Sequence, residues 1–401
     1  MHILILPSEL YCPPKMPLMG IFQRHQAELL AGGGNQVGVV SFGYIPWRFL
    51  LHGFPYPAKE ESPGLNVIRQ FAWPLLPARF AHSIFRRQFL RRAQALVRSY
   101  INIHGRPDVI HAHNSLYAGL VAARFGRESG IPVVLTEHSS AFYSQSFSHQ
   151  DLDDIKEAIG ASAIVSAVGT NLANRLSSIV SSGNKDCVVL GNLLDPFVEA
   201  RAHADAEPLG GQGPGAGFTA LAVGALSPVK NHQLLLKSFA RAFKGDPSAC
   251  LRLGGGGSLG PMLHSLADSL GIRSQVEFLG PLSREQVVLE MSQCDVFVSS
   301  STVETFGVVL IEAMAFGKPV LATRSGGPQD IIQEGQGLLV DVDEEDLARG
   351  LVRIRQIPFD SMAIHRHCID SYGSAAFFTK LMTLYHSACG QTLQVVCKNV
   401  Q

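Results

Sequence analysis

The stretch SSSTVETFGVVLIEAMAFGKPV (residues 299–320) holds the pattern that decides the fold. An apolar run ends at Ser299, a Ser/Thr loop follows, an apolar helical segment covers Gly307–Phe316, and another apolar run occupies Pro319–Thr323. A strand, a helix and a second strand in this order form a βαβ unit, whose two strands lie parallel in one sheet. The stretch therefore predicts a parallel α/β architecture.

The same alternation of short apolar runs and helical segments extends over the rest of the second half of the chain. The expected strands are Thr219–Val223, Ala249–Leu253, Val276–Leu279, Asp295–Ser299, Pro319–Thr323 and Leu338–Asp341. The expected helices are Asn231–Lys244, Ser258–Leu270, Ser283–Cys294, Gly307–Phe316 and Glu344–Arg355, with a final amphipathic helix at Ser374–His386 after a loop. Strands and helices in this alternation predict a doubly wound sheet.

The first half of the chain shows the same alternation less regularly. The expected strands are His2–Leu6, Val37–Ser41, Val109–His111, Val133–Thr136, Ala163–Val168 and Val188–Leu190. The expected helices are Ile21–Leu30, Ser115–Glu128 and Asn171–Ile179. Residues 41–73 contain no pattern that we can interpret. We therefore expect a second doubly wound sheet in this half.

A change in composition separates the two halves. Seven of the ten residues in PLGGQGPGAG (208–217) are Gly or Pro, which predicts a linker rather than a helix or a central strand. We expect two parallel-sheet, Rossmann-like α/β domains at 1–200 and 218–365, a linker at 201–217, and a C-terminal segment at 366–401 whose helix returns to the first domain. Ligands bind at the carboxyl ends of the strands in such sheets, so a cleft between the two domains is the expected site.

The overall composition excludes several classes of protein. The chain has 401 residues, of which 46% are hydrophobic and 16% charged, unlike disordered or collagen-like proteins. Its 33 basic and 33 acidic residues balance, whereas a dedicated nucleic-acid binder needs surplus positive charge. Seven scattered cysteines without a C-x-x-C pair are typical of a reducing compartment rather than of a disulfide framework or a zinc site.

The sequence also predicts the location of the protein. The N-terminal apolar run Ile3–Leu6 is too short for a signal peptide, and no apolar stretch approaches the length of a membrane span. We therefore expect a cytoplasmic protein. Residues 62–106 contain eight arginines and no acidic residue, and those of Arg79–Arg98 interleave with apolar residues. Such a helix can lie on an anionic membrane, at the inner face of the cell membrane, or it can be an ordinary solvated helix face.

The strongest candidate site lies in the stretch quoted first. Gly307 puts no side chain at the start of its helix, so the first helical amides are free to bind an anion. Glu304 and Glu312 are eight residues apart, which is about 12 Å of helical rise and matches the distance from the sugar to the ribose of a nucleotide-sugar. A capping loop with one solvated glutamate is the alternative, but it explains poorly a carboxylate inside the apolar helix VVLIEAMAF.

This stretch resembles the E-x7-E signature of family 4 retaining glycosyltransferases, in the extended form E-T-F-G-x-x-x-x-E-A-M-A-x-G-x-P-V. Other segments follow in the order of that family, and the likeness covers nearly the whole chain. They are DVIHAH (108–113), LTEHSS (135–140), VGALSPVKNH (223–232), GGGGSL (254–259), VEFLG (276–280), CDVFVSSS (294–301) and SGGPQDII (325–332). The resemblance implies the two-domain GT-B fold, a nucleotide-sugar donor and no metal or other cofactor.

The resemblance also implies a role for each matching residue. Glu304 would contact the hydroxyls of the donor sugar, Lys230 would neutralise the diphosphate, and His138 would reach the reaction centre from the first domain. Glu312 would hold the ribose, Gly20 would let the backbone approach the β-phosphate, and the turn 325–327 would shape the pocket. The implied catalytic residues are Glu304, His138 and Lys230. The implied donor-binding residues are Gly20, Gly224, Lys230, Gly254, Gly255, Phe278, Thr305, Phe306, Gly307, Val308 and Glu312.

One position departs from the family pattern. Ala225 stands where the family commonly has an arginine that acts with the lysine against the diphosphate. Arg324 and Arg252 are the nearest candidates for a replacement cation by motif position. Alternatively, helix amides serve instead of a second cation.

Three shorter patterns favour simpler explanations. Residues 255–260 match G-x-G-x-x-G, but they follow the second strand of their domain, whereas a dinucleotide-binding loop follows the first. Asp151 and Asp153 match the D-x-D of metal-dependent glycosyltransferases, but they open a helical segment, where acidic residues cap the helix. His111 and His113 share a face at a strand end, and without a third ligand we expect a hydrogen-bonded role rather than a zinc site.

We therefore expect a retaining glycosyltransferase that moves a sugar from a UDP- or GDP-sugar to a hydroxyl of a glycan or lipid-linked acceptor, in polysaccharide or glycoconjugate synthesis. No carboxylate stands out as a nucleophile, so we follow the resemblance, which implies front-face transfer, in which the leaving phosphate takes the proton of the acceptor. A nucleotide-sugar epimerase and a non-catalytic sugar-nucleotide-binding protein are the alternatives. The pair Glu304 and Glu312 argues against the first, and Ala225 is the feature that favours the second.

Overall fold

A computed structural model describes residues 1–8, 11, 19–44, 59–72, 82–144, 147–179, 186–204 and 217–391. The chain divides into two compact units, which we describe separately. Unit 1 comprises Met1–Val168, Leu172–Leu193 and Phe377–Gln401, and unit 2 comprises Gly169–Asn171 and Leu194–Ala376. The predicted class, two parallel-sheet α/β domains, is confirmed.

Within the described residues, the sheet of unit 1 has eight strands in the order β3-β4-β2-β1-β5-β6-β7-β8. They are β1 (His2–Leu6), β2 (Gln36–Tyr44), β3 (Lys59–Ser62), β4 (Leu65–Ala72), β5 (Val109–His113), β6 (Val133–Glu137), β7 (Ile164–Ala167) and β8 (Cys187–Val189). Neighbouring strands are parallel except β3 and β4, which are antiparallel. The central strands β1, β5 and β6 are buried throughout, because helices cover both faces of the sheet.

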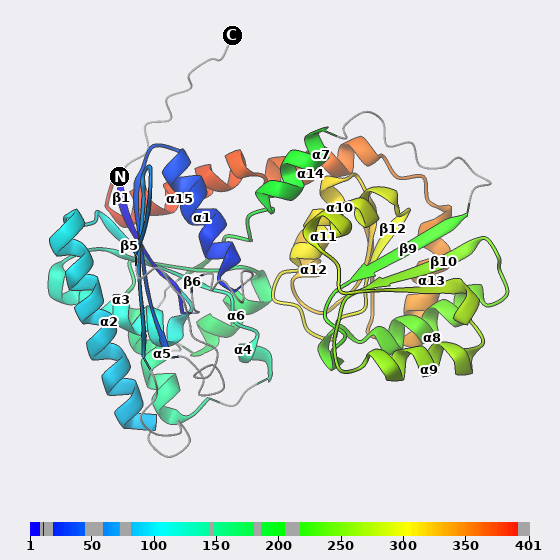
Figure 1. The fold of residues 1–401 in the computed structure, drawn as a ribbon, viewed down its shortest axis with the longest axis horizontal. Helices are drawn as coiled ribbons and strands as arrows, with labels where there is room; N and C mark the ends of the chain where they lie inside the picture. The colour runs from blue at the N-terminus through cyan, green and yellow to red at the C-terminus, as the bar shows by residue number, and fades with distance from the viewer. Residues whose placement is uncertain are drawn as a thin grey trace, which may run out of the picture. The chain divides into compact units, whose positions relative to one another are not determined.

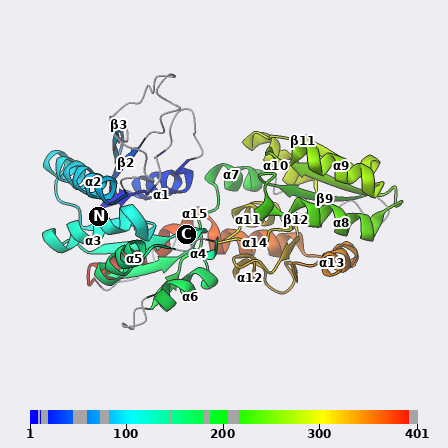
Figure 2. The same cartoon turned by 90° about the horizontal axis from the view of Figure 1, so that it is seen from below.

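The helices of unit 1 cover the two faces of its sheet. They are α1 (Ile21–Gly32), α2 (His82–His104), α3 (Leu120–Ser129), α4 (Ala141–Ser144), α5 (His149–Ala161), α6 (Thr170–Ile179) and α15 (Ser374–Ala388), with a distorted turn at Ser115–Gly119. On one face, Leu30 of α1 shares a core with Phe377 and Leu381 of α15, and α2, α3 and α5 lie on the other face (Figure 1). Figure 2 shows β2 and β3 at the edge near α2, with α5 and α6 toward the opposite edge.

Within the described residues, the sheet of unit 2 has six parallel strands in the order β11-β10-β9-β12-β13-β14. They are β9 (Phe218–Val223), β10 (Ala249–Gly254), β11 (Val276–Gly280), β12 (Val296–Ser299), β13 (Val320–Thr323) and β14 (Gly337–Val340). Numbered from β9, this is the 3-2-1-4-5-6 order of a doubly wound nucleotide-binding sheet. The order reverses between β9 and β12, which lie side by side.

The helices of unit 2 also cover both faces of their sheet (Figure 1). They are α7 (Pro196–Ala204), α8 (His232–Phe243), α9 (Gly260–Leu270), α10 (Arg284–Gln293), α11 (Val308–Ala315), α12 (Pro328–Ile331), α13 (Glu344–Gln356) and α14 (Ser361–Tyr372), with 3-10 turns at Pro228–Lys230 and Arg273–Gln275. On one face, α8, α9 and α13 contribute Leu235, Leu263 and Leu347 to a common core. The opposite face is covered by α10, α11 and α14.

Three elements differ from the sequence expectation. The antiparallel pair β3–β4 falls in residues 41–73, where we found no pattern, and it makes the sheet of unit 1 mixed rather than fully parallel. Helix α14 occupies Ser361–Tyr372, where we expected a loop. The helix expected at 115–128 begins only at Leu120, because Asn114 and Tyr117 before it adopt positive φ angles of 69° and 60°.

The units also divide at other places than the composition suggested. We expected boundaries at 201–217 and 366, whereas the units change at Leu194 and Phe377. The segment before the Gly/Pro stretch already belongs to unit 2, because the amide of Leu194 donates to the carbonyl of Tyr372 at 2.9 Å and the carboxylate of Glu199 accepts from the amide of Ser374 at 3.0 Å. Residues 205–216, the centre of the predicted linker, lie outside the described residues.

Gly38 of β2 shows how closely α2 packs on the sheet of unit 1. A Cβ atom at Gly38 would lie 2.2 Å from Cζ of Tyr100. The Tyr100 ring is fully buried, and its hydroxyl donates to Nε2 of His2 at 2.8 Å. The ring therefore has no room to move aside without breaking a buried hydrogen bond.

We predict that Gly38→Ala lowers the free energy of unfolding by about 1–3 kcal/mol, because the added methyl group overpacks this contact. Urea unfolding measures the change. Gly32→Ala is the matched control, since Gly32 lies in α1 with no atom within 4 Å of the added Cβ. The control should be neutral or more stable by about 0.5–1 kcal/mol. Equal stability of both variants would contradict the close contact.

Candidate functional site

In unit 2, the candidate site lies where the strand order reverses. Ligands of open α/β sheets bind outside the carboxyl ends of the strands at such a reversal. The segment after β9 runs through Gly224 to Lys230, and the segment after β12 runs from Ser300 to Gly307. The reversal therefore brings together two motifs that are more than 70 residues apart in the chain.

Lys230 and Glu304 form an ion pair across these two segments. The Nζ atom of Lys230 lies 2.5 Å from Oε2 of Glu304, and the two side chains are 30% and 16% exposed. The hydroxyl of Ser300 donates to the carbonyl of Lys230 at 2.9 Å, and the amide of Thr302 donates to the carbonyl of Val229 at 2.8 Å. Main-chain contacts therefore fix the two segments that carry the pair.

A third segment, Ser325–Gly327 after β13, holds the backbone of Glu304. The amide of Glu304 donates to the carbonyl of Ser325 at 2.9 Å, and the amide of Gly327 donates to the carbonyl of Glu304 at 2.8 Å. A Cβ at Gly327 would lie 2.1 Å from the carbonyl oxygen of Phe306. Gly327 is therefore required for this close approach, and the turn 325–327 lies against the main chain of 304–306.

Gly307 opens α11 in a conformation that favours glycine. Its φ is 111°, and no side chain caps the helix. Among the described residues, the amides of Val308 and Val309 have no hydrogen-bond acceptor, whereas the amide of Leu310 donates to the carbonyl of Gly307. The start of α11 therefore presents unpaired amides, as an anion-binding helix start requires.

Glu312 lies little more than one turn after Gly307 in α11 and is half-buried. Within the described part of the chain its carboxyl group makes no hydrogen bond or ion pair. Burial and, to a smaller extent, the nearby charge of Asp195 raise the pKa of Glu312, Arg284 opposes them, and the net pKa is about 8. Arg284 is itself hydrogen-bonded to Asp195. Glu312 is therefore a carboxyl group without a hydrogen-bond partner among the described residues.

Glycines after β9 and β10 pack backbone against backbone beside Lys230. A Cβ at Gly255 would lie 1.9 Å from the carbonyl oxygen of Gly224, and Gly255 has a φ of 141°. The amide of Gly224 donates to the carbonyl of Gly254 at 2.9 Å. These glycines therefore form a close-packed turn beside the ion pair.

Several predicted residues lie elsewhere. Phe278 stacks on His264 of α9, with 3.8 Å between ring centroids, and packs against the core of unit 2. The side chain of Phe306 is 2% exposed and packs on Tyr372 of α14, so only the main chain of Phe306 can face a ligand. The structure therefore does not bring the ring of Phe278 to the Lys230–Glu304 pair.

The two cations considered as replacements at Ala225 are engaged in other contacts. Arg324 pairs with Asp341 at 3.5 Å, and both side chains are more than half exposed. Arg252 pairs with Glu277 at 3.2 Å and with Glu290 at 3.1 Å. Neither arginine is paired with Glu304.

In unit 1, the strand order reverses between β1 and β5, and His138 lies beyond the end of the neighbouring β6. Its Nε2 atom lies 3.0 Å from Nδ1 of His113. Its amide donates to Oδ1 of Asn114 at 3.0 Å. The side chain and the main chain of His138 are thus both held by the end of β5.

Glu137, which the sequence analysis did not identify, ties the ends of β5 and β6 together. Its buried carboxylate accepts from the amide and the hydroxyl of Ser115 at 2.8 and 2.6 Å, from the amide of Ser139 at 2.9 Å and from the amide of His138 at 3.1 Å. Burial raises the pKa of Glu137, and these hydrogen bonds oppose the shift. Glu137 therefore positions both loops through one buried group.

Three histidines stand in a row at this end of the sheet. Burial lowers the pKa of His111 to about 3, that of His138 to about 4 and that of His113 well below its usual value. His111 lies between the hydroxyls of Tyr385 and Thr136, at 2.8 and 2.7 Å. All three rings are therefore neutral, and the hydrogen-bonded role expected for His111 is confirmed. Among the described residues, no group of three or more His, Cys, Asp or Glu side chains gathers as a metal site.

The turn after β5 is strained and held by Ser8. Tyr117 has φ 60° and ψ −80°, a conformation that costs free energy for a residue with a side chain. The hydroxyl of Ser8 donates to the carbonyl of His113 at 2.6 Å and lies 2.9 Å from that of Leu116, and it accepts from the amide of Ala118 at 3.3 Å. The contacts of Ser8 thus keep this turn in place at the end of the sheet.

Gly20 directly precedes α1 with a φ of 73°, a conformation suited to glycine. Residues 12–18, which precede it, lie outside the described residues. Gly20 is therefore the N-cap of α1, in a backbone conformation that favours glycine, and its proposed contact with the β-phosphate stays a prediction.

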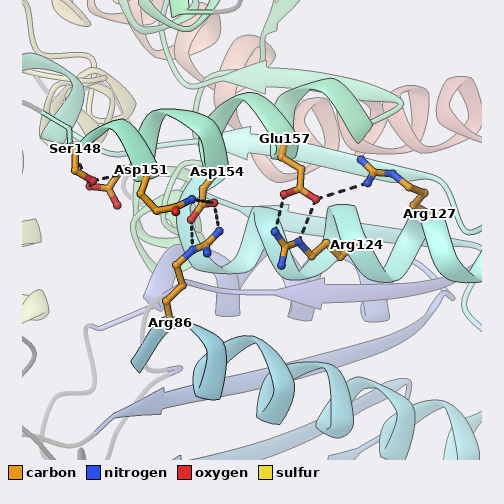
Figure 3. A network of polar contacts seen from close by, with 8 residues as sticks. Arg86, Arg124, Arg127, Ser148, Asp151, Asp154 and Glu157 are labelled. Carbon is orange, nitrogen blue, oxygen red and sulfur yellow. Dashed lines mark hydrogen bonds and ion pairs between the residues drawn. The ribbon is translucent and has the colours of Figure 1, made fainter. Parts of the chain in front are cut away.

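The D-x-D pattern caps a helix, as predicted. Ser148 is the N-cap of α5: its hydroxyl accepts from the amide of Asp151 at 3.1 Å, and the carboxylate of Asp151 accepts from the amide of Ser148 at 3.1 Å. Figure 3 shows Ser148 and Asp151 at the start of α5, with Asp154 one turn further along. This capping box explains the first aspartate of the pattern without a metal.

Some arginines of α2 form ion pairs, and others are exposed on its surface. Arg86 of α2 forms a two-point ion pair with the buried Asp154 (Figure 3), and Arg98 pairs with Glu128 at 2.9 Å. Arg87, Arg91 and Arg92 are exposed on α2. The apolar residues Phe89, Leu90, Ala93 and Val97 are buried, so they do not form an exposed apolar face. Arg79 lies outside the described residues.

The helices described in this structure include none that combines the length and the apolar character needed to cross a membrane. The described side of α2 that faces away from the sheet is basic rather than apolar. A contact of α2 with a membrane would therefore rest on charge.

Sequence patterns pointed to some of these groups and missed others. Ser8 and Asn114 act through contacts with distant residues, and nothing in their immediate sequence marks them. A buried acid at the end of a strand, as in LTEHSS, is the signal that could have identified Glu137. Arg284 and Asp195 reach Glu312 only through the fold.

Two family descriptions match the chain. Residues 22–196 match Glycosyltransferase Family 4, and residues 213–366 match Glycosyl transferases group 1. The D-inositol 3-phosphate glycosyltransferase of Streptosporangium roseum is 30% identical over 83% of this chain and 81% of that relative. The alpha-monoglucosyldiacylglycerol synthase of Acholeplasma laidlawii is 23% identical over 85% of this chain and 88% of that relative.

The match to the D-inositol 3-phosphate glycosyltransferase of Corynebacterium glutamicum is shorter. It is 38% identical and spans 30% of each chain. The match to the Corynebacterium efficiens protein of the same name spans 42% of that relative. This chain thus covers less than half the length of these two relatives.

Two solved structures share the fold. Sucrose-phosphate synthase from Thermosynechococcus elongatus has a TM-score of 0.71 at 23% identity, over 96% of this chain and 99% of that one. HepE from Anabaena in complex with UDP has a TM-score of 0.67 at 19% identity, over 96% of this chain and 100% of that one. Both likenesses concern the fold, and they confirm the predicted GT-B class.

We predict that Glu312 makes the stability of the ligand-free protein depend on pH. Its pKa is about 8 in the folded protein against 4.5 for an ordinary glutamate. The folded state therefore holds one more proton than the unfolded state between these pH values, and stability falls as the pH rises through this window. Glu312→Gln mimics the protonated group, so its stability relative to wild type should increase from about pH 5 to about pH 8.

Urea unfolding of both proteins at several pH values across this window measures the trend. Glu334→Gln, at an exposed position in the same unit, is the matched control. A stability difference between Glu312→Gln and wild type that stays constant with pH would contradict the raised pKa.

Proposed function

The chain belongs to glycosyltransferase family 4, and we propose that it transfers a sugar from a nucleoside diphosphate sugar, a UDP- or GDP-sugar, to a hydroxyl group with retention of the anomeric configuration. The observation that carries the proposal is the pairing of Lys230 with Glu304 beside the open start of α11. A cation, a carboxylate and unpaired amides at one strand reversal suit a diphosphate joined to a sugar.

The diphosphate of the donor would bind to Lys230 and to the amides of Val308 and Val309. These amides lack an acceptor within the described chain, and the helix start carries partial positive charge. When a phosphate of the donor forms an ion pair with Lys230, the carboxylate of Glu304 is released from its own ion pair with that lysine. It then becomes available to the hydroxyls of the sugar.

Glu312 would accept a hydrogen bond from the ribose of the donor. It lies eight residues after Glu304, and its carboxyl group makes no hydrogen bond among the described residues. A ribose hydroxyl would supply the missing partner. This contact does not change during the reaction, so it contributes affinity rather than rate.

In the reaction, the bond from the anomeric carbon to the diphosphate breaks and a bond to the acceptor oxygen forms on the same face. The acceptor proton passes to the leaving diphosphate oxygen. Positive charge develops on the sugar in the transition state, and the carboxylate of Glu304 stabilises it there. We propose that Lys230 and the amides of α11 stabilise the leaving group, so that no metal ion is needed.

Unit 1 would contribute His138. Its imidazole is neutral, since burial lowers its pKa to about 4, and His113 and Asn114 hold it in place. A neutral imidazole can exchange a hydrogen bond with a sugar hydroxyl without adding charge. We assign to it the contact with a sugar at the reaction centre.

The acceptor is proposed to be a hydroxyl of a glycan or a lipid-linked molecule, in the synthesis of a polysaccharide or glycoconjugate of the cell envelope. The name of one relative, which refers to a glucosyl diacylglycerol, supports a lipid acceptor, and that of another, which refers to D-inositol 3-phosphate, supports a hydroxyl group as the acceptor. Exposed Arg87, Arg91 and Arg92 on α2 support contact with an anionic membrane at the cytoplasmic face.

A nucleotide-sugar epimerase and a non-catalytic sugar-nucleotide-binding protein are the alternatives. The separate positions of Glu304 and Glu312 favour transfer over epimerisation. Release of nucleoside diphosphate from the donor, with or without acceptor, would exclude the non-catalytic protein. Screening of UDP-, GDP- and ADP-sugars by thermal shift and product release tests the donor class.

We predict that the two glutamates have separable effects. Glu304→Gln should lower kcat by about 100- to 1000-fold with little change in donor affinity, because it removes charge at the developing cation. Glu312→Ala should raise the donor KM by about tenfold, because it removes a contact that is constant along the reaction. Steady-state kinetics with the donor found in the screen measures both constants.

Glu334→Gln, at an exposed position of the same unit, serves as the control and should match wild type. Near-normal kcat in Glu304→Gln would refute the role of its charge. Equal loss of affinity in both glutamate variants, without loss of kcat, would refute the division of roles.

We also predict that Arg87, Arg91 and Arg92 bind anionic lipid. Each basic residue near such a surface contributes about 1 kcal/mol, so the triple change to Gln should abolish co-sedimentation with phosphatidylserine vesicles. Donor binding should not change, because none of these three residues is among the proposed donor contacts. Arg86 is left intact, since its change would expose the buried charge of Asp154.

The same change at Arg241, Arg349 and Arg353, which are exposed in unit 2, is the control and should leave sedimentation unchanged. Wild-type protein that does not sediment with the vesicles at low salt would remove the membrane contact.

A further inference from the structure

A bound diphosphate carries more negative charge than Lys230 can balance alone. Ala225 adds no charged side chain at this turn, and Arg252 and Arg324 are engaged in other ion pairs. Lys230 is also shared with Glu304 in the ligand-free protein. Among the described residues, positive charge at the donor site is therefore scarce.

His232 lies in the same segment as Ala225 and Lys230. It is the first residue of α8, two positions after Lys230, and it is 6% exposed. In the part of the chain that the structure describes, neither ring nitrogen has a hydrogen-bond partner. The main chain of Ala225 raises the pKa of the ring and the charge of Lys230 lowers it, so both groups lie near the ring.

The main chain at His232 also has amide groups without hydrogen-bond acceptors among the described residues. Asn231 caps α8 with a φ of 49° and provides no side-chain hydrogen bond. Among the described residues, the amides of His232 and Gln233 have no acceptor, whereas those of Leu234 and Leu235 donate to the carbonyl of Asn231. The uncapped helix start and the unpartnered ring therefore occur together, beside Lys230 and Ala225.

A buried imidazole without partners is destabilising unless a ligand or water completes it. An apolar side chain would fill the same space without this cost. The polar residue is therefore explained best by a group that is absent from the ligand-free protein. The absent group must accept a hydrogen bond from the ring and be compatible with the positive charge of Lys230. An anion meets both conditions.

We propose that His232 is a further diphosphate-binding residue, whose ring N–H donates to a phosphate oxygen of the bound donor. This inference rests on the proposed function and deepens it, because it assigns a second side chain to the diphosphate next to Lys230. Burial and Lys230 together lower the pKa of the free ring to about 4, so the ring is neutral before the ligand binds. The neutral ring has one N–H group, and a phosphate oxygen of the donor accepts its hydrogen bond in the complex.

The test compares His232→Leu with wild type, both as the full chain. The probes are UDP, GDP and ADP, and affinity is measured by isothermal titration for the nucleotide that wild type binds most tightly. We expect the Tm of ligand-free His232→Leu to equal or exceed that of wild type, because no hydrogen bond is lost. We expect its Kd to rise by about tenfold or more.

Two further variants separate binding from structure. His232→Gln retains an N–H donor and should recover part of the affinity. Ser238→Ala removes a hydrogen bond from the hydroxyl of Ser238 to the carbonyl of Glu344, 2.9 Å away, on the same helix. It should lower Tm and leave Kd unchanged, which shows that destabilising α8 does not by itself weaken binding.

The outcomes are distinct. An unchanged Kd in His232→Leu overturns the inference and leaves the proposed function standing. A fall in Tm for His232→Leu greater than that for Ser238→Ala overturns it as well, because it would reveal a structural hydrogen bond of the ring. Wild-type protein that binds none of the three nucleotides overturns the proposed donor class and this inference together.

Discussion

The ion pair between Lys230 and Glu304 is the contact on which the site of unit 2 depends. Each partner is half-buried, so removing one leaves the other with an uncompensated charge. The pair exists because β9 and β12 are neighbours, and because main-chain hydrogen bonds to Ser325 and Gly327 hold the carboxylate in position. A ligand that is anionic at one end and hydroxylated at the other can separate the pair and satisfy both partners.

Backbone groups complete this arrangement. The starts of α8 and α11 carry unpaired amides within the described chain, and Gly307 permits the conformation that exposes those of α11. Glu312 and His232 are polar groups without hydrogen-bond partners among the described residues. Groups of this kind destabilise the empty protein and are satisfied by a ligand. Stability of the ligand-free form is thus lower than an apolar site would allow.

In unit 1, the side chains at the end of the sheet are held in place by a different kind of contact. A single buried carboxylate, Glu137, accepts four hydrogen bonds from the loops after β5 and β6. Ser8 holds the strained turn at Tyr117. Strain of this kind persists only where several contacts impose it, and these contacts converge around His138. The imidazole is therefore oriented before any ligand arrives.

The sequence by itself determined the two parallel α/β sheets and the segment that carries Glu304, Gly307 and Glu312, because hydrophobic periodicity and glycine position act locally. Tertiary structure alone decided which groups meet. It paired Lys230 with Glu304 across 74 positions, packed Phe278 against the core, and gave Arg86 a partner in the buried Asp154. Such pairings depend on strand order and helix packing, which bring together residues whose separation in the chain carries no periodic signal.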